Sequence, residues 1–594
     1  MKAVAFFLVL VVAKASMLAG RPLHLSAWAI AAYFWQDLLV ALVFGFLDLS
    51  LKRFKTGNRI AWVGYGVLVT YVAVNVPVAR LLSSPLTVQM LGATRGALLD
   101  SIKYHATPIN LLLVGLVTAT GISVPLFLQS SKLRLEGLES SAAGVIGAAI
   151  ALLALILLGP QSTLRVDTEG RGRNAVTALA MSSMPRITAR ASDSVVGETW
   201  RARFQNSMPS NEDLSGLHGT ASGRNVVMIL LESAGAEYLN TEESDIDPMP
   251  NLSLLKRSAV TFENAYSVYP ESIKGLFSVL CSRYPAMDTD AEEYSRITTP
   301  SIAEVLRRNG YHTGLFHSGR FMYLGMESVV ENRGYDVLED AGAIGGNFES
   351  SFGVDEASTV RRALKWIDTV PTDQHFFLTY LPIAGHHPYE TPAPGPFKGS
   401  TDRDRYLNAL RYADDSLGEL LGGLSARGLD QHTLFVIFGD HGEAFGQHEG
   451  NYGHSLFLFD ENVHVPYLLA APGLIGRRLP VSRAMSLIDT APTILDLLGI
   501  KCPTECQGMS ALEDKTEPAL FYTDYSLSLV GLRDGNWKYI HEIESNRSKL
   551  FDVSCDPGEL VDRSSEFPDR VAAYRSRLLR WASAQKALIR GSGE

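Results

Sequence analysis

Five charge-poor apolar stretches follow one another along the first 160 residues, and each approaches the length of a membrane-spanning helix. A helix needs about 20 apolar residues to cross a bilayer. The stretches lack the alternation of apolar and polar residues that barrel strands show, so helices are expected. They cover residues 4–19, 27–47, 60–82, 109–128 and 142–158. The pattern predicts a domain of about five transmembrane helices over residues 1–160 and a polar linker over residues 161–223.

Basic residues in the loops predict the orientation of this bundle, because cytoplasmic loops are enriched in Lys and Arg. The loops expected inside carry Lys52, Arg53, Lys55, Arg59, Lys132 and Arg134, and those expected outside carry Arg21, Arg95 and Lys103. Lys2 and the apolar run after it also fit a cleaved signal peptide, but the four further spans favour a retained first helix. The chain after Gly159 is then expected on the extracytoplasmic or periplasmic face of the inner cell membrane.

Two ionisable residues, Lys14 and Asp37, fall within or beside the apolar spans. A charge inside a membrane is a functional hypothesis by default. The structural alternatives are that Lys14 reaches toward the headgroups and that Asp37 lies in the bundle interior. Neither residue is assigned a role.

Beyond the linker, apolar runs alternate with helical patterns. The runs at residues 225–231, 376–381, 433–438 and 465–470 are nearly continuous, as expected of strands that are buried on both faces. Amphipathic helices are expected between them, such as residues 301–308, which stop at Asn309-Gly310, and residues 406–424. The alternation predicts an α/β domain over residues 224–500 with a mostly parallel sheet.

Acidic residues or histidines come after three of these strands. Glu232 follows the first strand, His386 and His387 come after the second, and Asp440-His441 follow the third. Ligands gather at the carboxyl ends of strands in such sheets. Mixed carboxylate and imidazole ligands suit Zn²⁺ or Mn²⁺ best, although Ca²⁺ and Mg²⁺ stay open. The three strand ends therefore predict a site for one divalent metal ion.

Composition and cysteine spacing disfavour two further classes, nucleic-acid-binding proteins and zinc-knuckle proteins. Apolar residues make up 46% of the 594 residues and the formal net charge is −10, so nothing in the charge balance favours nucleic-acid binding. The four cysteines lack the spacing of a zinc knuckle. Cys502 and Cys506 are close enough to pair in an oxidising compartment, and free thiols are the alternative.

Several short motifs together resemble the sulfatase-type branch of the alkaline-phosphatase superfamily. They include Pro-Asn-Leu at 250–252, Phe-Glu-Asn-Ala-Tyr at 262–266, Arg-Tyr-Pro at 283–285 and Asp-His-Gly-Glu at 440–443. Gly-Asn-Trp-Lys-Tyr at 535–539 and Asp-Pro-Gly-Glu at 556–559 are similar to the C-terminal subdomain of sulfatases, here expected over residues 501–594. The resemblance covers about residues 224–580 and implies a metal-dependent enzyme.

The resemblance places the family's nucleophile at Ser272. Sulfatases that mature to formylglycine carry Cys or Ser followed by x-Pro-x-Arg there, whereas this chain reads Ser272-Ile-Lys-Gly-Leu276. An unmodified serine nucleophile resembles lipoteichoic-acid synthases and phosphoglycerol or phosphoethanolamine transferases, which also carry membrane helices and a single Glu ligand like Glu232. A bound metal would activate this hydroxyl. The structural alternative for Ser272 is a helix N-cap, and Ser267 and Ser278 are the other candidate nucleophiles.

The resemblance also assigns histidines and implies a ligand set. His386 matches the histidine that contacts substrate or donates a proton, and His454 resembles the residue that contacts the transferred group. The implied metal ligands are Glu232, Ser272, Asp440 and His441, with Glu443 expected to orient His441. Secondary candidates for the site are His387, His448, Lys274 and His317.

Three functions remain open at this stage. The first is transfer or hydrolysis of a phosphoryl-type group, with a phospholipid donor and an envelope glycan or lipid acceptor. The second is hydrolysis of sulfuric esters. The third is an inactive envelope sensor or scaffold, which the presence of Glu232, Asp440 and His441 disfavours.

Overall fold

The computed structural model describes residues 1–23, 26–92, 105–130, 142–188, 213–239, 246–348, 352–513 and 517–591. Four of the basic loop residues used above, Arg95, Lys103, Lys132 and Arg134, lie outside these ranges.

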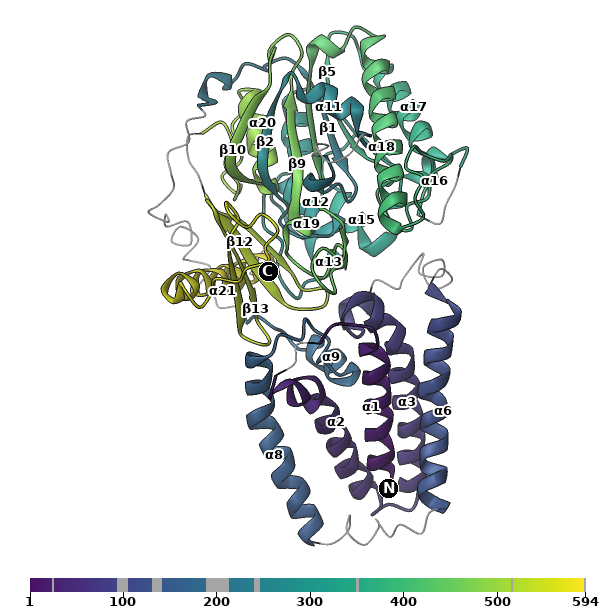
Figure 1. Ribbon diagram of the computed structural model, residues 1–594. Helices are drawn as coiled ribbons and strands as arrows, with labels where there is room; N and C mark the ends of the chain where they lie inside the picture. The colour runs from purple at the N-terminus through teal and green to yellow at the C-terminus, as the bar shows by residue number, and fades with distance from the viewer. Residues whose placement is uncertain are drawn as a thin grey trace.

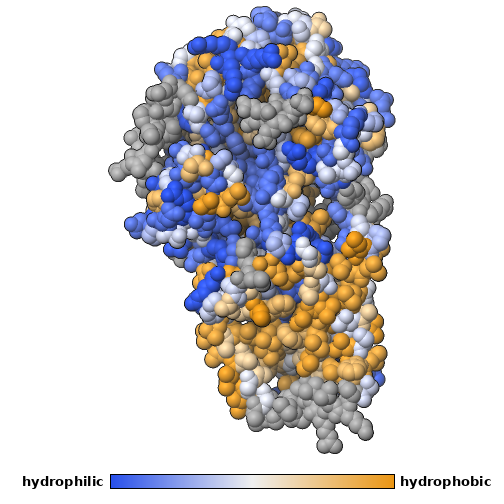
Figure 2. Space-filling view, in the orientation of Figure 1, coloured by the Kyte–Doolittle hydropathy of each residue, from blue (hydrophilic) through white to orange (hydrophobic). Residues whose placement is uncertain are grey.

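Long apolar helices form the N-terminal part of the molecule, below the α/β part in Figure 1. Their bounds are α1 (Lys2–Leu18), α2 (Ala29–Leu51), α3 (Gly57–Leu82), α6 (Pro108–Ser130) and α8 (Ala142–Arg165). Within the described ranges, α2, α3, α6 and α8 are long and apolar enough to cross a membrane. Helix α1 has 17 residues, the lower limit for a span, and packs among them. Figure 2 shows the apolar surface that these helices present.

The two ends of the bundle differ in what they contact. The Lys2 ammonium is 2.5 Å from Asp48 Oδ1 and donates to Asn58 Oδ1 at 2.8 Å, so the N-terminus lies beside the basic α2–α3 loop. The α/β part lies at the opposite end (Figure 1). There, the short helix α9 (Ala175–Ser182) contacts α2, α3 and the short helix α4 (Val88–Gly92), and Met90 of α4 packs in one apolar cluster with Leu529.

An eight-stranded sheet forms the centre of the α/β domain, in the order β10-β2-β9-β6-β1-β5-β3-β4. All neighbouring strands are parallel except for β9, which is antiparallel to β2 and β6. The strands are β1 (Asn225–Leu231), β2 (Ala259–Tyr266), β3 (Tyr311–His317), β4 (Val337–Glu339), β5 (His375–Leu381), β6 (Thr433–Gly439), β9 (His464–Ala470) and β10 (Leu479–Ser486).

Helices cover both faces of this sheet, as the alternation predicts. One core contains residues of α12 (Ser272–Cys281), α14 (Ile302–Arg308) and α20 (Thr490–Leu497). The other contains residues of α17 (Glu356–Ile367) and α18 (Asp402–Ser425), with α11 (Pro250–Lys256). Shorter elements are α13 (Ala291–Tyr294), α15 (Glu327–Val330), α16 (Ala341–Ile344), α19 (Asp460–Val463), β7 (Ala444–Phe445) and β8 (Tyr452–Gly453).

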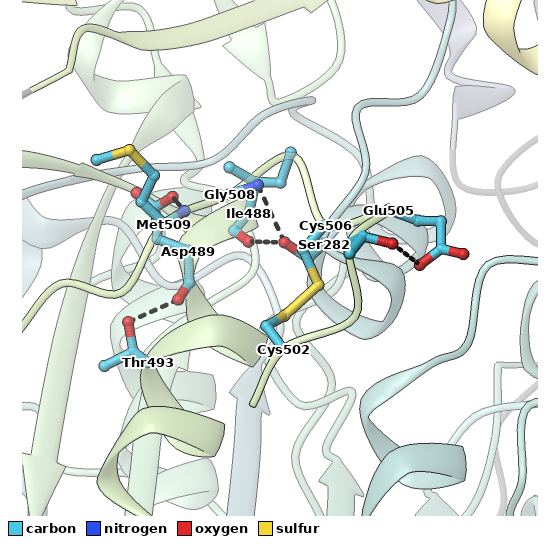
Figure 3. The surroundings of a disulfide bond; sticks show 10 residues. Ser282, Ile488, Asp489, Thr493, Cys502, Glu505, Cys506, Gly508 and Met509 are labelled. Carbon is cyan, nitrogen blue, oxygen red and sulfur yellow. Dashed lines mark hydrogen bonds between the residues drawn. A yellow bond between two sulfur atoms is a disulfide. The ribbon is translucent and has the colours of Figure 1, made fainter. Parts of the chain in front are cut away.

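A second, antiparallel sheet follows near the C-terminus and carries the long helix α21 (Pro568–Gly591) on one face. Its strands are β11 (Ala519–Thr523), β12 (Leu529–Asp534), β13 (Trp537–Glu542) and β14 (Arg547–Asp552). Cys502 and Cys506 form a disulfide in the segment between the two sheets. Figure 3 shows this segment beside Ser282, whose hydroxyl donates to Ile488 O and accepts from Gly508 N–H. Because Ser282 caps the C-terminal end of α12, the segment is fastened to that helix.

Candidate metal centre and active site

Four side chains that the sequence singled out converge at the carboxyl edge of the large sheet. Glu232 follows β1, Asp440 and His441 follow β6, and Ser272 begins α12. Ser272 Oγ lies 2.7 Å from Asp440 Oδ2, 3.0 Å from Glu232 Oε2 and 3.4 Å from His441 Nε2. His441 Nε2 lies 3.7 Å from Glu232 Oε1 and 3.5 Å from Asp440 Oδ2. All three partners of Ser272 are buried.

Backbone geometry after β1 holds the two carboxylates in place. Ser233 has a left-handed backbone with φ of 55°, and its N–H donates to Asp440 Oδ1 at 2.9 Å. Its hydroxyl donates to Glu232 Oε1 at 2.8 Å. Gly385 approaches from the β5 loop, where a Cβ atom would lie only 2.0 Å from the Glu232 carbonyl oxygen. Only glycine allows this contact between the two loops.

The donor atoms of Glu232, Asp440 and His441 fit a divalent cation. They form the one cluster of His, Cys, Asp or Glu in the described ranges whose ligand atoms all lie within 4.8 Å of one another. His441 Nδ1–H donates to Gly442 O at 3.0 Å, so Nε2 is the ring nitrogen that faces the carboxylates. Two carboxylates, an imidazole nitrogen and the Ser272 oxygen form a donor set for a divalent cation.

Burial and the neighbouring charges raise the pKa of Asp440 and lower the pKa of Glu232. Burial favours the neutral acid, and together with the nearby Glu232 it raises the pKa of Asp440 to about 6 despite the opposing effect of His441. Burial also acts to raise the pKa of Glu232, but His441, His386 and His454 outweigh it and lower that pKa. Two adjacent buried carboxylates repel each other, so a cation between them would relieve the repulsion.

Ser272 is the first residue of α12 and does not cap it, so the structural alternative considered above is wrong. The N-cap is Glu271, whose carboxylate accepts from Ile273 N–H at 2.9 Å and from Lys274 N–H at 3.4 Å. These two backbone donors are therefore already engaged. The Ser272 hydroxyl points instead to Glu232, Asp440 and His441.

His454 is held as a cation by a carboxylate. Its Nδ1 lies 2.7 Å from Glu443 Oε2, and its ring centroid lies 4.2 Å from that of His441. Burial alone would lower the pKa of His454, but the Glu443 carboxylate raises it to about 9. Glu443 also accepts from Tyr389 O–H at 2.6 Å. The expectation that Glu443 orients His441 is therefore wrong, because its hydrogen-bond partners are His454 and Tyr389.

His386 lies near His454, and His105 of the N-terminal helix bundle lies close to the neighbouring His387. The His386 ring is 6.3 Å from that of His454, and its Nδ1–H donates to His387 O. The neighbouring His387 stacks at 5.5 Å on His105, which lies just before α6. Burial, with the added effect of His386 and His105, lowers the pKa of His387 to about 4, so this ring is neutral. His105 therefore brings the N-terminal helix bundle close to the residues that surround the candidate metal ligands.

The other candidates have partners outside the cluster. Lys274 pairs with Asp524 at 3.0 Å, and Ser278 donates to Gly275 O in its own helix. His448 pairs with Glu461 at 2.7 Å. His317 is buried and its Nδ1 contacts Leu381 O at 3.0 Å. Ser267, the last alternative nucleophile, is buried and its N–H donates to Val463 O.

Comparison with known proteins agrees with this geometry. The sulfatase family matches residues 224–500, and the C-terminal region of N-sulphoglucosamine sulphohydrolase matches residues 449–568. Arylsulfatase K from Mus musculus is 31% identical over 243 residues, which are 36% of this chain and 43% of the relative. The lipoteichoic acid synthase-like protein YvgJ from Bacillus subtilis is 23% identical over 311 residues, or 49% of each chain. The chain thus spans less than half the length of each of these two relatives.

A solved structure supports the fold. A protein of the alkaline phosphatase superfamily from Vibrio parahaemolyticus has a TM-score of 0.52 with this chain at 18% identity. The match covers 69% of this chain and 98% of that one. The predicted α/β architecture with a mostly parallel sheet is confirmed.

Proposed function

Since residues 224–500 form a sulfatase-family domain of the alkaline-phosphatase superfamily, we propose that the protein is a membrane-anchored, metal-dependent enzyme that transfers or hydrolyses a phosphoryl-type group. The observation that carries this proposal is the position of the Ser272 hydroxyl, within 3.4 Å of Glu232, Asp440 and His441. A serine at the centre of a ligand set is placed to act as a nucleophile. Glu232, Ser272, Asp440 and His441 are the proposed ligands.

The residues have distinct roles in the proposed reaction. A divalent cation would lower the pKa of the serine hydroxyl and offset the charge of the phosphoryl oxygens. Ser272 Oγ, having released its proton to solvent, forms a bond to phosphorus while the bond from phosphorus to the leaving-group oxygen breaks. His386 donates a proton to that oxygen, which leaves as an alcohol. The oxygen of an acceptor alcohol or of water then bonds to phosphorus and gives its proton to His386, while the bond from phosphorus to Ser272 Oγ breaks and the serine is restored. The cationic His454 holds the anionic group throughout.

The position of the site near the bundle supports a substrate that resides in the membrane. His105, just before α6, stacks on His387, and His386 lies 6.3 Å from His454. The proposed active site therefore lies next to the end of a membrane helix. We infer a phospholipid donor, and an envelope glycan or a lipid as acceptor.

Two observations support an extracytoplasmic site. The basic residues of the α2–α3 loop lie at the end of the bundle that is remote from the α/β domain, beside Lys2. If that end faces the cytoplasm, as the enrichment of Lys and Arg inside predicts, then the catalytic domain lies outside the inner membrane. The disulfide between Cys502 and Cys506 is also typical of an oxidising compartment.

Hydrolysis of sulfuric esters is the second candidate. The family match and the likeness to arylsulfatase K favour it. The segment Ser272-Ile-Lys-Gly-Leu276 disfavours it, because neither the Pro nor the Arg of the maturation motif is present.

Parallel assays of the detergent-solubilised full chain distinguish the two candidates. We expect the purified protein to contain about one equivalent of Zn²⁺ or Mn²⁺ and to release headgroups from phospholipid vesicles. Dialysis against a chelator should abolish turnover, and adding back the metal should restore it. Mass spectrometry should find a phosphorylated Ser272 peptide. Turnover of aryl sulfate without this adduct would favour the sulfatase.

Ser272→Ala tests the nucleophile. We expect it to lower turnover by about a thousandfold or more, and Ser278→Ala, which alters the same helix away from the cluster, to stay near wild type. Equal turnover by Ser272→Ala and wild type would remove Ser272 from the mechanism.

A further inference from the structure

A buried lysine of the membrane domain holds the segment that leads out of the bundle. We call residues 167–174, between α8 and α9, the docking loop. The Lys14 ammonium donates to the carbonyl oxygens of three consecutive docking-loop residues, Arg171, Gly172 and Arg173, at 3.2, 3.1 and 2.7 Å. These contacts use the full donor capacity of an ammonium group. Lys14 thereby fixes the path of the loop backbone.

The ion pair partner of Lys14 holds the same loop. Asp37 lies 3.4 Å from Lys14, and both side chains are 3% exposed. Asp37 also accepts from Asn174 Nδ2–H at 2.6 Å. A cavity of about 30 Å³, large enough for one water molecule, adjoins the pair. A charge pair inside a helix bundle is costly, and its contacts here go to the loop that leaves the bundle.

The side chains of the docking loop reach in the other direction, into the α/β domain. Arg171 donates to Glu449 at 2.5 Å, and Arg173 contacts Glu544 at 2.9 Å. Glu449 lies in the hairpin formed by β7 and β8, and His454 directly follows that hairpin. The bundle touches the hairpin at a second point, where Ser83 O–H donates to Gly450 O at 2.7 Å. A connected set of contacts thus runs from Lys14 to the segment that carries His454.

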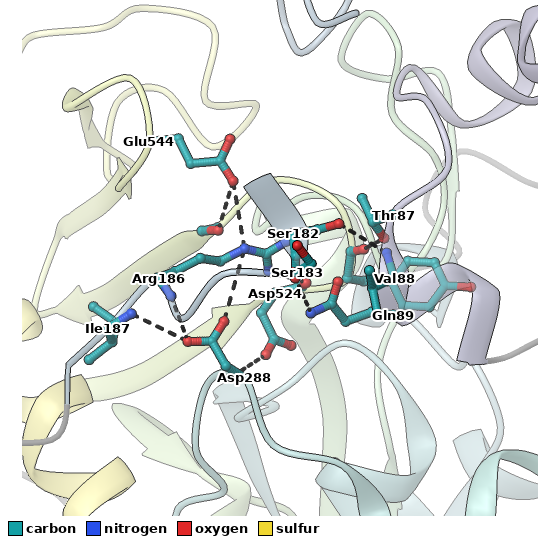
Figure 4. Close-up of polar contacts among 12 residues, drawn as sticks. Thr87, Val88, Gln89, Ser182, Ser183, Arg186, Ile187, Asp288, Asp524 and Glu544 are labelled. Carbon is teal, nitrogen blue, oxygen red and sulfur yellow. Dashed lines mark hydrogen bonds and ion pairs between the residues drawn. The ribbon is translucent and has the colours of Figure 1, made fainter. Parts of the chain in front are cut away.

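A parallel connection reaches the helix that carries Ser272. In Figure 4, Arg186, which follows α9, extends toward Asp288 and Glu544. Its guanidinium also donates to Asp524 O at 2.6 Å. The Asp524 carboxylate pairs with Lys274 of α12. Both segments that form the proposed substrate site are therefore tied to the chain that leaves the bundle.

We propose that Lys14 is a positioning residue for the active site: through the docking loop and Glu449 it sets the place of the β7–β8 hairpin and hence of His454. The test by kcat/KM rests on the proposed function, whereas the test by hydrogen exchange does not. The chain offers a matched control in Lys2, a second buried lysine of α1 with its own ion pair to Asp48, at the end of the bundle remote from the α/β domain.

The test compares Lys14→Met with Lys2→Met in the full chain in lipid nanodiscs. We expect Lys14→Met to increase hydrogen exchange in peptides covering residues 446–455, with no increase for Lys2→Met. For the ester that the wild type hydrolyses, we expect kcat/KM to fall by about tenfold to a hundredfold in Lys14→Met. Lys14→Arg keeps N–H donors for the docking-loop carbonyls and should recover most of the lost kcat/KM. Lys2→Met should stay within about twofold of wild type.

A second variant keeps the proposal testable if Lys14→Met does not fold. Glu449→Gln weakens the same connection outside the membrane and should reproduce the exchange and kinetic changes. Wild-type exchange in Lys14→Met, equal changes in the two lysine variants, or wild-type behaviour of Glu449→Gln would overturn the proposal. Absence of ester turnover by the wild type would overturn the proposed function alone, because hydrogen exchange still tests Lys14.

Discussion

The contact between Glu443 and His454 shows how one carboxylate controls a neighbouring charge. Glu443 raises the pKa of His454 to about 9, so His454 is a cation at neutral pH. A reaction that needs this cation proceeds below the pKa and declines as the pH rises through it. The alkaline limb of the pH profile of kcat/KM therefore reports the loss of the positive charge on His454.

Glu443→Gln should shift that alkaline limb to lower pH by about one unit or more, because the amide keeps the shape but removes the charge. The measurement is kcat/KM from pH 6 to pH 10. Tyr389→Phe is the matched control, since it removes one hydrogen bond to Glu443 but keeps the carboxylate. Identical alkaline limbs in wild type and Glu443→Gln would show that His454 does not act as a cation.

At the level of residues, the sequence indicated the central cluster but few of its supports. Glu232, Asp440 and His441 could be recognised because each directly follows a buried strand. Ser233 also follows a strand, but serine and tyrosine are common in loops, so neither Ser233 nor Tyr389 stood out. Their roles depend on backbone geometry and on contacts between distant segments. His105 was missed for the same reason, since it contacts His387 from a different domain.

Helix α12 places the proposed nucleophile, Ser272, through its first turn. Because the Glu271 carboxylate binds the N–H groups of Ile273 and Lys274, it holds the backbone on both sides of Ser272. A capping side chain contributes about 1 kcal/mol to stability. Here the same contact also fixes the direction of the Ser272 side chain.

Glu271→Ala should therefore destabilise the protein by about 1 kcal/mol and reduce turnover more strongly than that loss of stability explains. Glu271→Asp, which can still cap the helix, should retain most of the stability and most of the turnover. Chemical unfolding and steady-state kinetics on the same preparations provide the comparison. If Glu271→Ala lost stability but kept full turnover, the cap would have no part in placing Ser272.

Elements were predictable where burial dominates the sequence. The four predicted runs correspond to β1, β5, β6 and β9, and the predicted helices correspond to α14 and α18. Strands β2 and β10 were not predicted, because polar residues such as Glu263 and Arg483 interrupt their apolar pattern. The antiparallel direction of β9 could not be read from composition, since it depends on how the chain returns to the sheet.

At the scale of the whole molecule, the orientation in the membrane can be tested with a native thiol. Cys555 is exposed in the C-terminal subdomain, whereas Cys281 is buried and Cys502 and Cys506 are paired. A membrane-impermeant maleimide should label Cys555 in intact spheroplasts. Lys55→Cys in a Cys555→Ser background should be labelled only after lysis. The reverse pattern would place the catalytic domain in the cytoplasm.

The arrangement of the domains relative to each other could not be predicted from the chain. Apolar runs indicated the helices, but the contacts between Ser83 and Gly450 and between Lys14 and the docking loop join residues far apart in sequence. Lys14 and Asp37 were visible as charges in apolar surroundings, and only the folded structure shows what they hold.

The stacking of His105 on His387 has a consequence for the choice of substrate. Because His105 lies just before α6 and stacks on the neighbour of His386, a large molecule bound at the proposed site would also lie against the end of the helix bundle. Small water-soluble esters would not reach the bundle. A catalytic domain separated from its helices is therefore expected to lose more activity toward bulky, bilayer-resident esters than toward small ones.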